Sequence, residues 1–261
     1  MDFNKPAGVL IKTTCVDYPG RVAGSFFLKG CNLRCPYCYN IGLVEPNSSE
    51  DDLNTVQELF DHLQKRQGIL SGIVISGGEP TINPYTPIII KKAKELGYKV
   101  KIDTNGLLPA KIRTFLDDDA LRPDFIAMDI KTAPKKYNTL LCPVKHSGGT
   151  VQNQTADTQK SAALQSSDFI VKALKESAAL VATLPQDCRE FRTVLVPPLV
   201  TKEDIKEIAE ILPEDASWQF AQFRNENCLD PSYNEILPYT DSEIEELIKF
   251  AKSLIPCAAL R

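Results

Sequence analysis

Residues 22–38 read VAGSFFLKGCNLRCPYC, an apolar run that ends in three closely spaced cysteines. The segment Val22–Lys29 is rich in aliphatic and aromatic residues and is followed by Gly30, a pattern that predicts a β-strand ending in a loop. In that loop the cysteines follow the spacing C-x3-C-x2-C. This spacing brings three thiolates to one point and leaves no fourth cysteine nearby.

Three thiolates without a fourth ligand favour an iron–sulfur cluster over zinc. A [4Fe–4S] cluster takes a thiolate on each iron, so Cys31, Cys35 and Cys38 would leave one iron open to the amino and carboxylate groups of a small molecule. Structural zinc needs a closed set of four ligands, usually from two paired motifs. The chain has no second C-x2-C pair, and its only histidines are His62, in a predicted surface helix, and His146.

Composition and charge limit the class of protein. With 43% hydrophobic and 25% charged residues among 261, the chain can form a sizeable core. A formal net charge of −4 argues against nucleic acid as the main partner, because phosphate binding requires a basic surface. We find no apolar run of membrane-helix length and no signal peptide. Eight cysteines without such a signal favour thiols in a reducing compartment, so we expect a cytoplasmic protein with no membrane partner.

Strand-like and helix-like patterns alternate along the chain. The predicted strands are Val22–Lys29, Ile69–Ser76, Lys99–Thr104, Asp124–Lys131, Glu190–Val196 and Ser217–Phe223. The predicted helices are Asp52–Arg66, Pro87–Leu96, Pro109–Asp118, Phe169–Leu184, Lys202–Leu212 and Asp241–Leu254. Six βα units in this order imply parallel strands with right-handed crossovers. Because six units are too few for a closed eight-unit barrel, we predict an α/β fold with an open, partial (βα)6 barrel.

The whole chain, residues 1–261, is predicted to form a single domain with one insertion. From residue 143 to residue 167 the sequence is dominated by Ser, Gly, Gln, Thr, Asn and Ala. Such a segment buries too little apolar surface to offset its ordering entropy, which predicts a flexible insertion after the fourth strand. A partner-binding loop is the alternative interpretation.

Polar residues gather at the ends of the predicted strands, and in a βα barrel those ends form the active site. The second strand runs into Ser76-Gly77-Gly78-Glu79-Pro80, where glycines allow close backbone approach to a ligand and a carboxylate suits a cationic amino group. The third ends in Asp103-Thr104-Asn105-Gly106, which is also an ordinary turn signal. Strand alternation points Asp129 and Lys131 to one side, so if buried these two charges would pair with each other or with a ligand, and an exposed ion pair is the alternative.

Together these motifs resemble the radical S-adenosylmethionine (SAM) superfamily, and within it the activating proteins of glycyl radical enzymes. The similarity is greatest to the group that activates anaerobic ribonucleoside-triphosphate reductase, and it covers nearly the whole chain except the insertion. The motifs that carry it are Asp17-Tyr18-Pro19-Gly20, Phe27–Asn40, Gly77-Gly78-Glu79-Pro80, Asp103-Thr104-Asn105-Gly106, Asp129-Ile130-Lys131 and Glu190-Phe191-Arg192-Thr193. The resemblance implies a [4Fe–4S] cluster on Cys31, Cys35 and Cys38, SAM as second cofactor, and oxidoreductase activity.

The resemblance also implies roles for residues around SAM. Tyr37 would lie beside the adenine, and the backbone from Gly77 through Gly78 to Glu79 would receive the amino group. The family usually has histidine after the third cysteine, where this chain has Tyr39, and this departure puts adenine packing or cluster tuning in question.

Further polar residues are implied at the ribose and carboxylate of SAM. Asp103, Thr104 and Asp129 would line the ribose or a monovalent cation near the SAM carboxylate. Lys131 and Arg192 would meet that carboxylate directly.

The resemblance implies a protein substrate. Asp17 would position the target peptide of a glycyl radical enzyme, and Gln222 would lie at the rim of the site. The expected partner is anaerobic (class III) ribonucleotide reductase, with reduced flavodoxin or ferredoxin as electron donor. The alternatives are a pyruvate formate-lyase-type activase, a small radical SAM enzyme acting on a metabolite (7-carboxy-7-deazaguanine synthase-like), and a non-catalytic metal-binding or scaffold protein.

Overall fold

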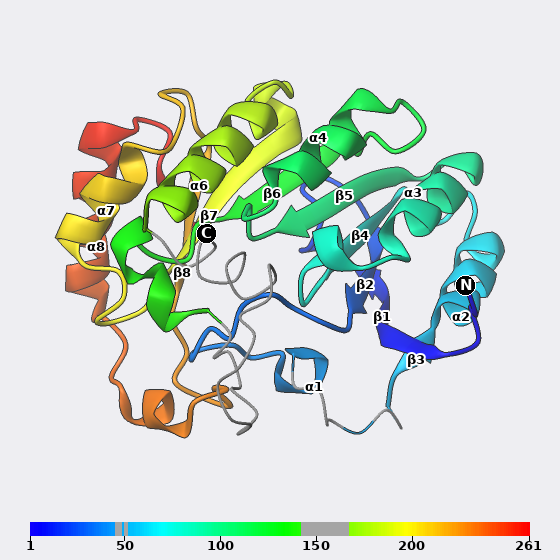
Figure 1. The fold of residues 1–261 in the computed structure, drawn as a ribbon, viewed down its shortest axis with the longest axis horizontal. Helices are drawn as coiled ribbons and strands as arrows, with labels where there is room; N and C mark the ends of the chain where they lie inside the picture. The colour runs from blue at the N-terminus through cyan, green and yellow to red at the C-terminus, as the bar shows by residue number, and fades with distance from the viewer. Residues whose placement is uncertain (45–48, 50–51, 142–166) are drawn as a thin grey trace, which may run out of the picture.

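The computed structural model describes residues 1–44, 49, 52–141 and 167–261, and these contain one nine-stranded sheet of order β3-β1-β2-β4-β5-β6-β7-β8-β9. Six strands are parallel, as predicted (Figure 1). They are β2 (Ala23–Leu28), β4 (Gly72–Gly77), β5 (Lys99–Thr104), β6 (Phe125–Asp129), β7 (Arg189–Leu195) and β8 (Trp218–Gln222). The predicted α/β class and parallel sheet are therefore confirmed.

Three further strands extend the sheet at its edges and were not predicted. β1 (Pro6–Thr14) and β3 (Asn54–Thr55) are antiparallel to their neighbours, whereas β9 (Ala259–Leu260) is parallel to β8. β1 lies next to the edge strand β3. Within β1 only Val9–Ile11 is a continuous apolar run, so the sequence predicts this strand only weakly. β3 and β9 are two residues long, and pairing with a distant strand defines them rather than their own sequence.

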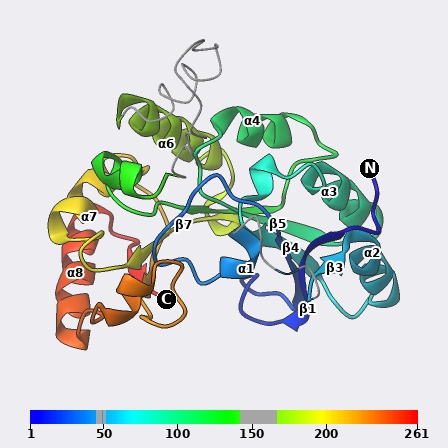
Figure 2. The same cartoon turned by 60° about the horizontal axis from the view of Figure 1, so that its bottom comes forward.

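Helices cover one side of the sheet in an arc that runs from α2 to α8, while α1 lies on the opposite, open side (Figure 2). Their bounds are α1 Ile41–Val44, α2 Val56–Lys65, α3 Thr86–Glu95, α4 Pro109–Asp117, α6 Ser167–Val181, α7 Lys202–Ala209 and α8 Asp241–Leu254. The predicted helix Asp52–Arg66 begins only at Val56, because Thr55 is its N-cap and forms a capping box with Glu58. Among the described residues, we see no helix with both the length and the apolar character needed to cross a membrane.

The predicted insertion, 143–167, lies outside the described residues except for Ser167, which begins α6. The strand predicted as Asp124–Lys131 ends at Asp129, so Lys131 lies just past the strand in the following loop.

The two faces of the sheet differ in chemistry. On the helix side, apolar residues such as Ile73, Ile75 and Val100 pack against α2 and α3 in a large buried cluster. The residues that alternate with them face the concave side, where a smaller apolar cluster forms around Tyr18. Lys101 is fully buried on this side of β5. Charged groups therefore lie inside the curve of the sheet, next to the C-terminal ends of the strands.

Candidate functional site

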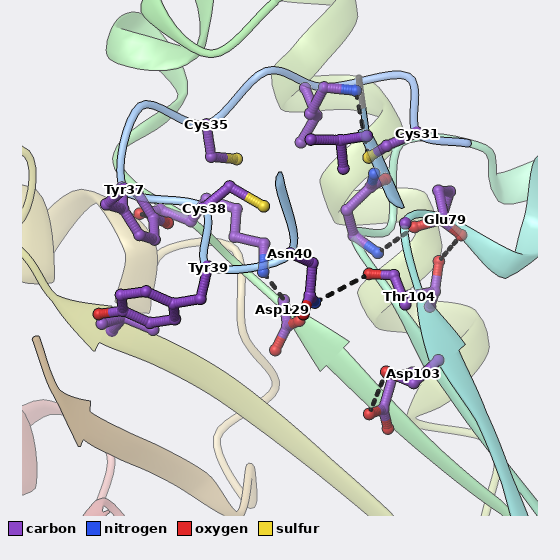
Figure 3. A pocket seen from close by; sticks show the side chains of 18 of the residues that line it. Cys31, Cys35, Tyr37, Cys38, Tyr39, Asn40, Glu79, Asp103, Thr104 and Asp129 are labelled. Atoms are coloured by element: carbon purple, nitrogen blue, oxygen red, sulfur yellow. Dashed lines mark hydrogen bonds and ion pairs between the residues drawn. The ribbon is translucent and has the colours of Figure 1, made fainter. Parts of the chain in front are cut away.

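One cavity of about 250 Å³ lies at the C-terminal ends of the parallel strands (Figure 3). All the residues predicted as metal ligands or cofactor contacts line it. They are Cys31, Cys35, Tyr37, Cys38, Tyr39, Gly77, Gly78, Glu79, Asp103, Thr104, Asp129, Lys131 and Arg192. Residues more than 160 positions apart in the sequence thus meet in one place, because the carboxyl ends of parallel strands share an edge of the sheet.

The three cysteines occupy the loop after β2 and turn their sulfur atoms toward a common space (Figure 3). Burial raises the pKa of the Cys31 thiol to about 11 and that of Cys35 to about 12. These thiols would therefore stay protonated near neutral pH unless a metal ligated them. Among the described residues, no three His, Cys, Asp or Glu side chains converge on a single metal ion. A cluster does not need such convergence, because each of its irons takes its own thiolate.

Glycines allow the end of β4 to approach the start of the cysteine loop. The Gly78 N–H donates to the Leu28 carbonyl at 2.8 Å, and the Glu79 N–H donates to the Gly30 carbonyl at 2.8 Å. A Cβ atom on Gly78 would lie 1.9 Å from the Gly30 carbonyl oxygen, and Gly77 has a φ of +107°. The predicted close approach at the two glycines is therefore present. In the structure, the segment that comes close to them is the backbone at the end of β2 and just after it.

Segments on two sides hold the cysteine loop in place. The Arg34 N–H donates to the Leu140 carbonyl at 2.7 Å, next to the 3-10 helix η2 (Pro134–Thr139). On the other side, the Leu229 N–H donates to the Cys38 carbonyl at 3.1 Å. Tyr39 contributes to the same side, because its hydroxyl accepts a hydrogen bond from the Arg224 N–H at 2.8 Å. The loop after β8 is thus docked onto the cysteine loop.

Two tyrosine hydroxyls position the backbone of Lys131. The Tyr137 hydroxyl accepts from the Lys131 N–H at 3.0 Å, and the Tyr37 hydroxyl donates to the Lys131 carbonyl at 3.4 Å. Tyr137 is fully buried, and Tyr37 nearly so. Tyr137 lies outside the quoted motifs, and no signal in the sequence distinguishes it from an ordinary core tyrosine.

The carboxylate of Glu79 is directed into its own loop. Its Oε1 accepts hydrogen bonds from the Thr81 N–H (2.9 Å), the Thr81 hydroxyl (2.5 Å) and the Thr104 hydroxyl (2.8 Å), and its Oε2 accepts from the Asn105 N–H at 2.7 Å. Burial raises the pKa of Glu79, although these donors oppose that shift. Oε1 accepts three of these bonds and Oε2 one, so the carboxylate joins the ends of β4 and β5, while its binding of an amino group stays a prediction.

Asp103, Asp129 and three cations, of which Lys101 is buried and Lys131 and Arg192 are partly buried, form an ion-pair network in the same cavity region. Asp129 Oδ1 lies 2.6 Å from Arg192 Nε, and its Oδ2 lies 2.9 Å from Lys131 Nζ. Asp103 Oδ1 lies 2.6 Å from Lys101 Nζ. Burial opposes ionisation of Asp129, yet the charges of Arg192 and Lys131 hold its pKa well below the usual range. The pairing predicted for Asp129 and Lys131 is present, with Arg192 as a third member.

Two residues predicted near the substrate lie outside this cavity. Asp17 is in the loop before β2, where its Oδ2 accepts a hydrogen bond from the Ser25 hydroxyl at 2.7 Å. That loop is at the N-terminal end of β2, whereas the cysteines follow its C-terminal end. Gln222 lines an adjoining cavity that shares Tyr39 and Val194 with the cysteine cavity. Gln222 is thus at a rim, while Asp17 does not line the cysteine cavity, and its role with a target peptide stays a prediction.

Comparisons with known proteins agree with this arrangement. Residues 25–153 match the Radical SAM superfamily. The chain is 29% identical over 253 residues to a Methanocaldococcus jannaschii protein whose name places it among glycyl-radical enzyme activating enzymes (97% of this chain, 94% of that protein). It is 28% identical over 200 residues to 7-carboxy-7-deazaguanine synthase of Hyperthermus butylicus (73% and 74%).

Among solved structures, Streptococcus suis SuiB has a similar fold, with a TM-score of 0.58 and 16% identity. The superposition covers 91% of this chain but only 47% of SuiB.

Proposed function

We propose that this protein is a radical SAM enzyme that activates a glycyl radical enzyme, with a [4Fe–4S] cluster and SAM as its cofactors, because residues 25–153 match the Radical SAM superfamily. The observation that carries the proposal is the single cavity with three cysteines on one wall and Lys131 and Arg192 on another. The near full-length similarity to a protein named as an activating enzyme supports the choice of substrate.

Each group of residues has a distinct task in this proposal. Cys31, Cys35 and Cys38 would ligate the cluster, and Lys131 would face the SAM carboxylate. The cluster and SAM together supply a radical that removes a hydrogen atom from a C–H bond of the substrate. The residues that line the cavity would bind SAM, fix its orientation and limit the access of bulk water.

The adjoining cavity supports access by a peptide. It is lined by polar side chains from the end of β8 and the loop after it, including Gln222, Arg224 and Asn227, and it meets the cysteine cavity at Tyr39. A glycine in an extended peptide could reach the radical from this side, because glycine has no side chain to obstruct its approach. We propose anaerobic ribonucleotide reductase as the partner and reduced flavodoxin or ferredoxin as the electron donor.

The test is formation of a glycyl radical on a candidate partner. Anaerobically reconstituted protein, SAM and a reductant are incubated with anaerobic ribonucleotide reductase and, in parallel, with pyruvate formate-lyase. We expect an EPR doublet on the reductase only. A doublet on the lyase alone would replace the proposed partner, and no doublet on either enzyme, with SAM still cleaved, would count against activation.

A metabolite-directed reaction is the second candidate, because the similarity to 7-carboxy-7-deazaguanine synthase covers 73% of the chain. It predicts that SAM cleavage is accelerated by the substrate of that synthase and not by any glycyl radical enzyme. Measuring 5′-deoxyadenosine with each substrate separates the two candidates.

A further inference from the structure

Asp103 and Asp129 offer four carboxylate oxygens at the ends of β5 and β6, where the resemblance allows either the SAM ribose or a monovalent cation. A bound sodium or potassium ion requires oxygen atoms that are free to coordinate it, without competing positive charges. The contacts of these two aspartates therefore decide whether such an ion fits.

All four carboxylate oxygens already have donors. Asp129 binds Arg192 Nε through Oδ1 (2.6 Å) and Lys131 Nζ through Oδ2 (2.9 Å). Asp103 binds Lys101 Nζ through Oδ1 at 2.6 Å. Its Oδ2 accepts from the Ser76 hydroxyl at 2.9 Å and lies 3.3 Å from two guanidinium nitrogens of Arg192.

Thr104, the third oxygen donor of the expected cation site, is also engaged. Its hydroxyl donates to Glu79 at 2.8 Å and accepts from the Gly106 N–H at 3.2 Å. The hydroxyl thus hydrogen bonds to both the loop after β4 and the loop after β5.

The carboxylates of the network are balanced by cationic side chains without an added ion. Glu190 Oε1 lies 3.7 Å from Lys101 Nζ and 3.7 Å from Arg192 NH1, so it joins the two aspartates. Three carboxylates then face three cations, Lys101, Lys131 and Arg192, and a fourth cation, Arg261, lies at the edge with its NH1 4.0 Å from Glu190. In the ion pairs that Asp103 and Asp129 form with these three cations, each side chain is at most 22% exposed. A further cation would add uncompensated positive charge in a poorly solvated place.

We propose that the guanidinium of Arg192 is the resident cation of this site, so that SAM cleavage by this protein needs no bound monovalent metal ion. Arg192 bridges Asp129 on β6 and Asp103 on β5 from its position on β7, and its planar group binds both carboxylates at once. The inference rests on SAM binding in this cavity and not on the identity of the partner.

The first test compares salts at equal ionic strength. Release of 5′-deoxyadenosine by reconstituted wild-type protein is measured without any partner enzyme in choline, sodium or potassium chloride. We expect rates that agree within about twofold, a difference too small for loss of a charged contact. A rate in choline chloride that is lower by more than about tenfold would overturn the proposal.

The second test removes the guanidinium. Arg192→Met keeps an apolar stem, and we expect SAM cleavage to fall by about tenfold or more in choline chloride and to recover with rising potassium or sodium. Arg192→Lys, which retains a charge, should respond less. Arg113→Met is the matched control, because Arg113 makes only a surface ion pair with Glu176 (3.1 Å), and it should show no response to the ion. Failure of both ions to restore Arg192→Met at any concentration would overturn the proposal.

A readout independent of activity separates this inference from the proposed chemistry. Potassium should raise the melting temperature of reconstituted Arg192→Met by about 2–4 °C over choline at equal ionic strength, and should leave the wild type unchanged. A specific rise in the wild type would contradict the proposal. If the wild type releases no 5′-deoxyadenosine in any salt, radical SAM chemistry fails, while the melting curves still decide whether the site takes an ion.

Discussion

Replacing Glu79 with glutamine tests whether this side chain organises the loops instead of binding ligand. The Glu79 carboxylate is 1% exposed and accepts four hydrogen bonds, three through Oε1 and one through Oε2. Glutamine has a single acceptor oxygen, so its amide nitrogen must face a donor. The least costly orientation places that nitrogen against the Asn105 N–H, which then loses its acceptor while buried.

An unsatisfied buried donor costs about 1–3 kcal/mol. A value near the middle of that range, about 2 kcal/mol, would lower the melting temperature of a chain of this size by about 4–8 °C. Thermal unfolding of reconstituted Glu79→Gln followed by circular dichroism measures this change. Glu176→Gln is the control, since Glu176 makes an exposed ion pair with Arg113 and its loss should cost at most about 1 kcal/mol. Glu79→Gln with wild-type stability but greatly weakened SAM binding would refute the structural role.

Other substitutions probe the cysteine loop and the network below it. Gly78→Ala should lower both stability and iron content, because its Cβ would lie 1.9 Å from the Gly30 oxygen and the backbone must shift; melting curves and iron analysis measure this. Tyr137→Phe leaves the Lys131 N–H without its acceptor, so it should destabilise by about 1–3 kcal/mol and weaken SAM binding in equilibrium dialysis at unchanged iron content. The depressed pKa of Asp129 means that its carboxylate stabilises the fold above the unfolded pKa of about 3.9 and loses that effect as pH falls. The stability difference between wild type and Asp129→Asn should therefore be constant above about pH 5 and shrink below about pH 4, as urea unfolding across pH would show.

The sequence predicts the parallel strands and the residues of the cavity because both depend on local patterns. Apolar runs identified the six central strands, and turn residues identified where each one ends. Once the strands are parallel, their C-terminal ends must converge, which brings Cys31, Asp103 and Arg192 together without knowledge of any specific contact.

Features that depend on distant contacts were missed. Lys101 is fully buried although lysine usually lies on the surface, and only its two-residue spacing from Asp103 signals that both face the inside. Asp17 accepts a hydrogen bond from Ser25, a contact that no motif reveals. Likewise, Tyr39 meets Arg224, 185 residues later, only because the loop after β8 folds back.

Release of 5′-deoxyadenosine by Cys variants tests the central claim most directly. Cys188 lies just before β7 and does not line the cavity, so Cys188→Ala is the control. After anaerobic reconstitution and reduction, the wild type and Cys188→Ala should both cleave SAM. Cys35→Ala should release none, because it removes a thiolate from the cluster. Equal release from Cys35→Ala and the wild type, or none from the wild type, would contradict a SAM-binding cluster held by the three-cysteine loop.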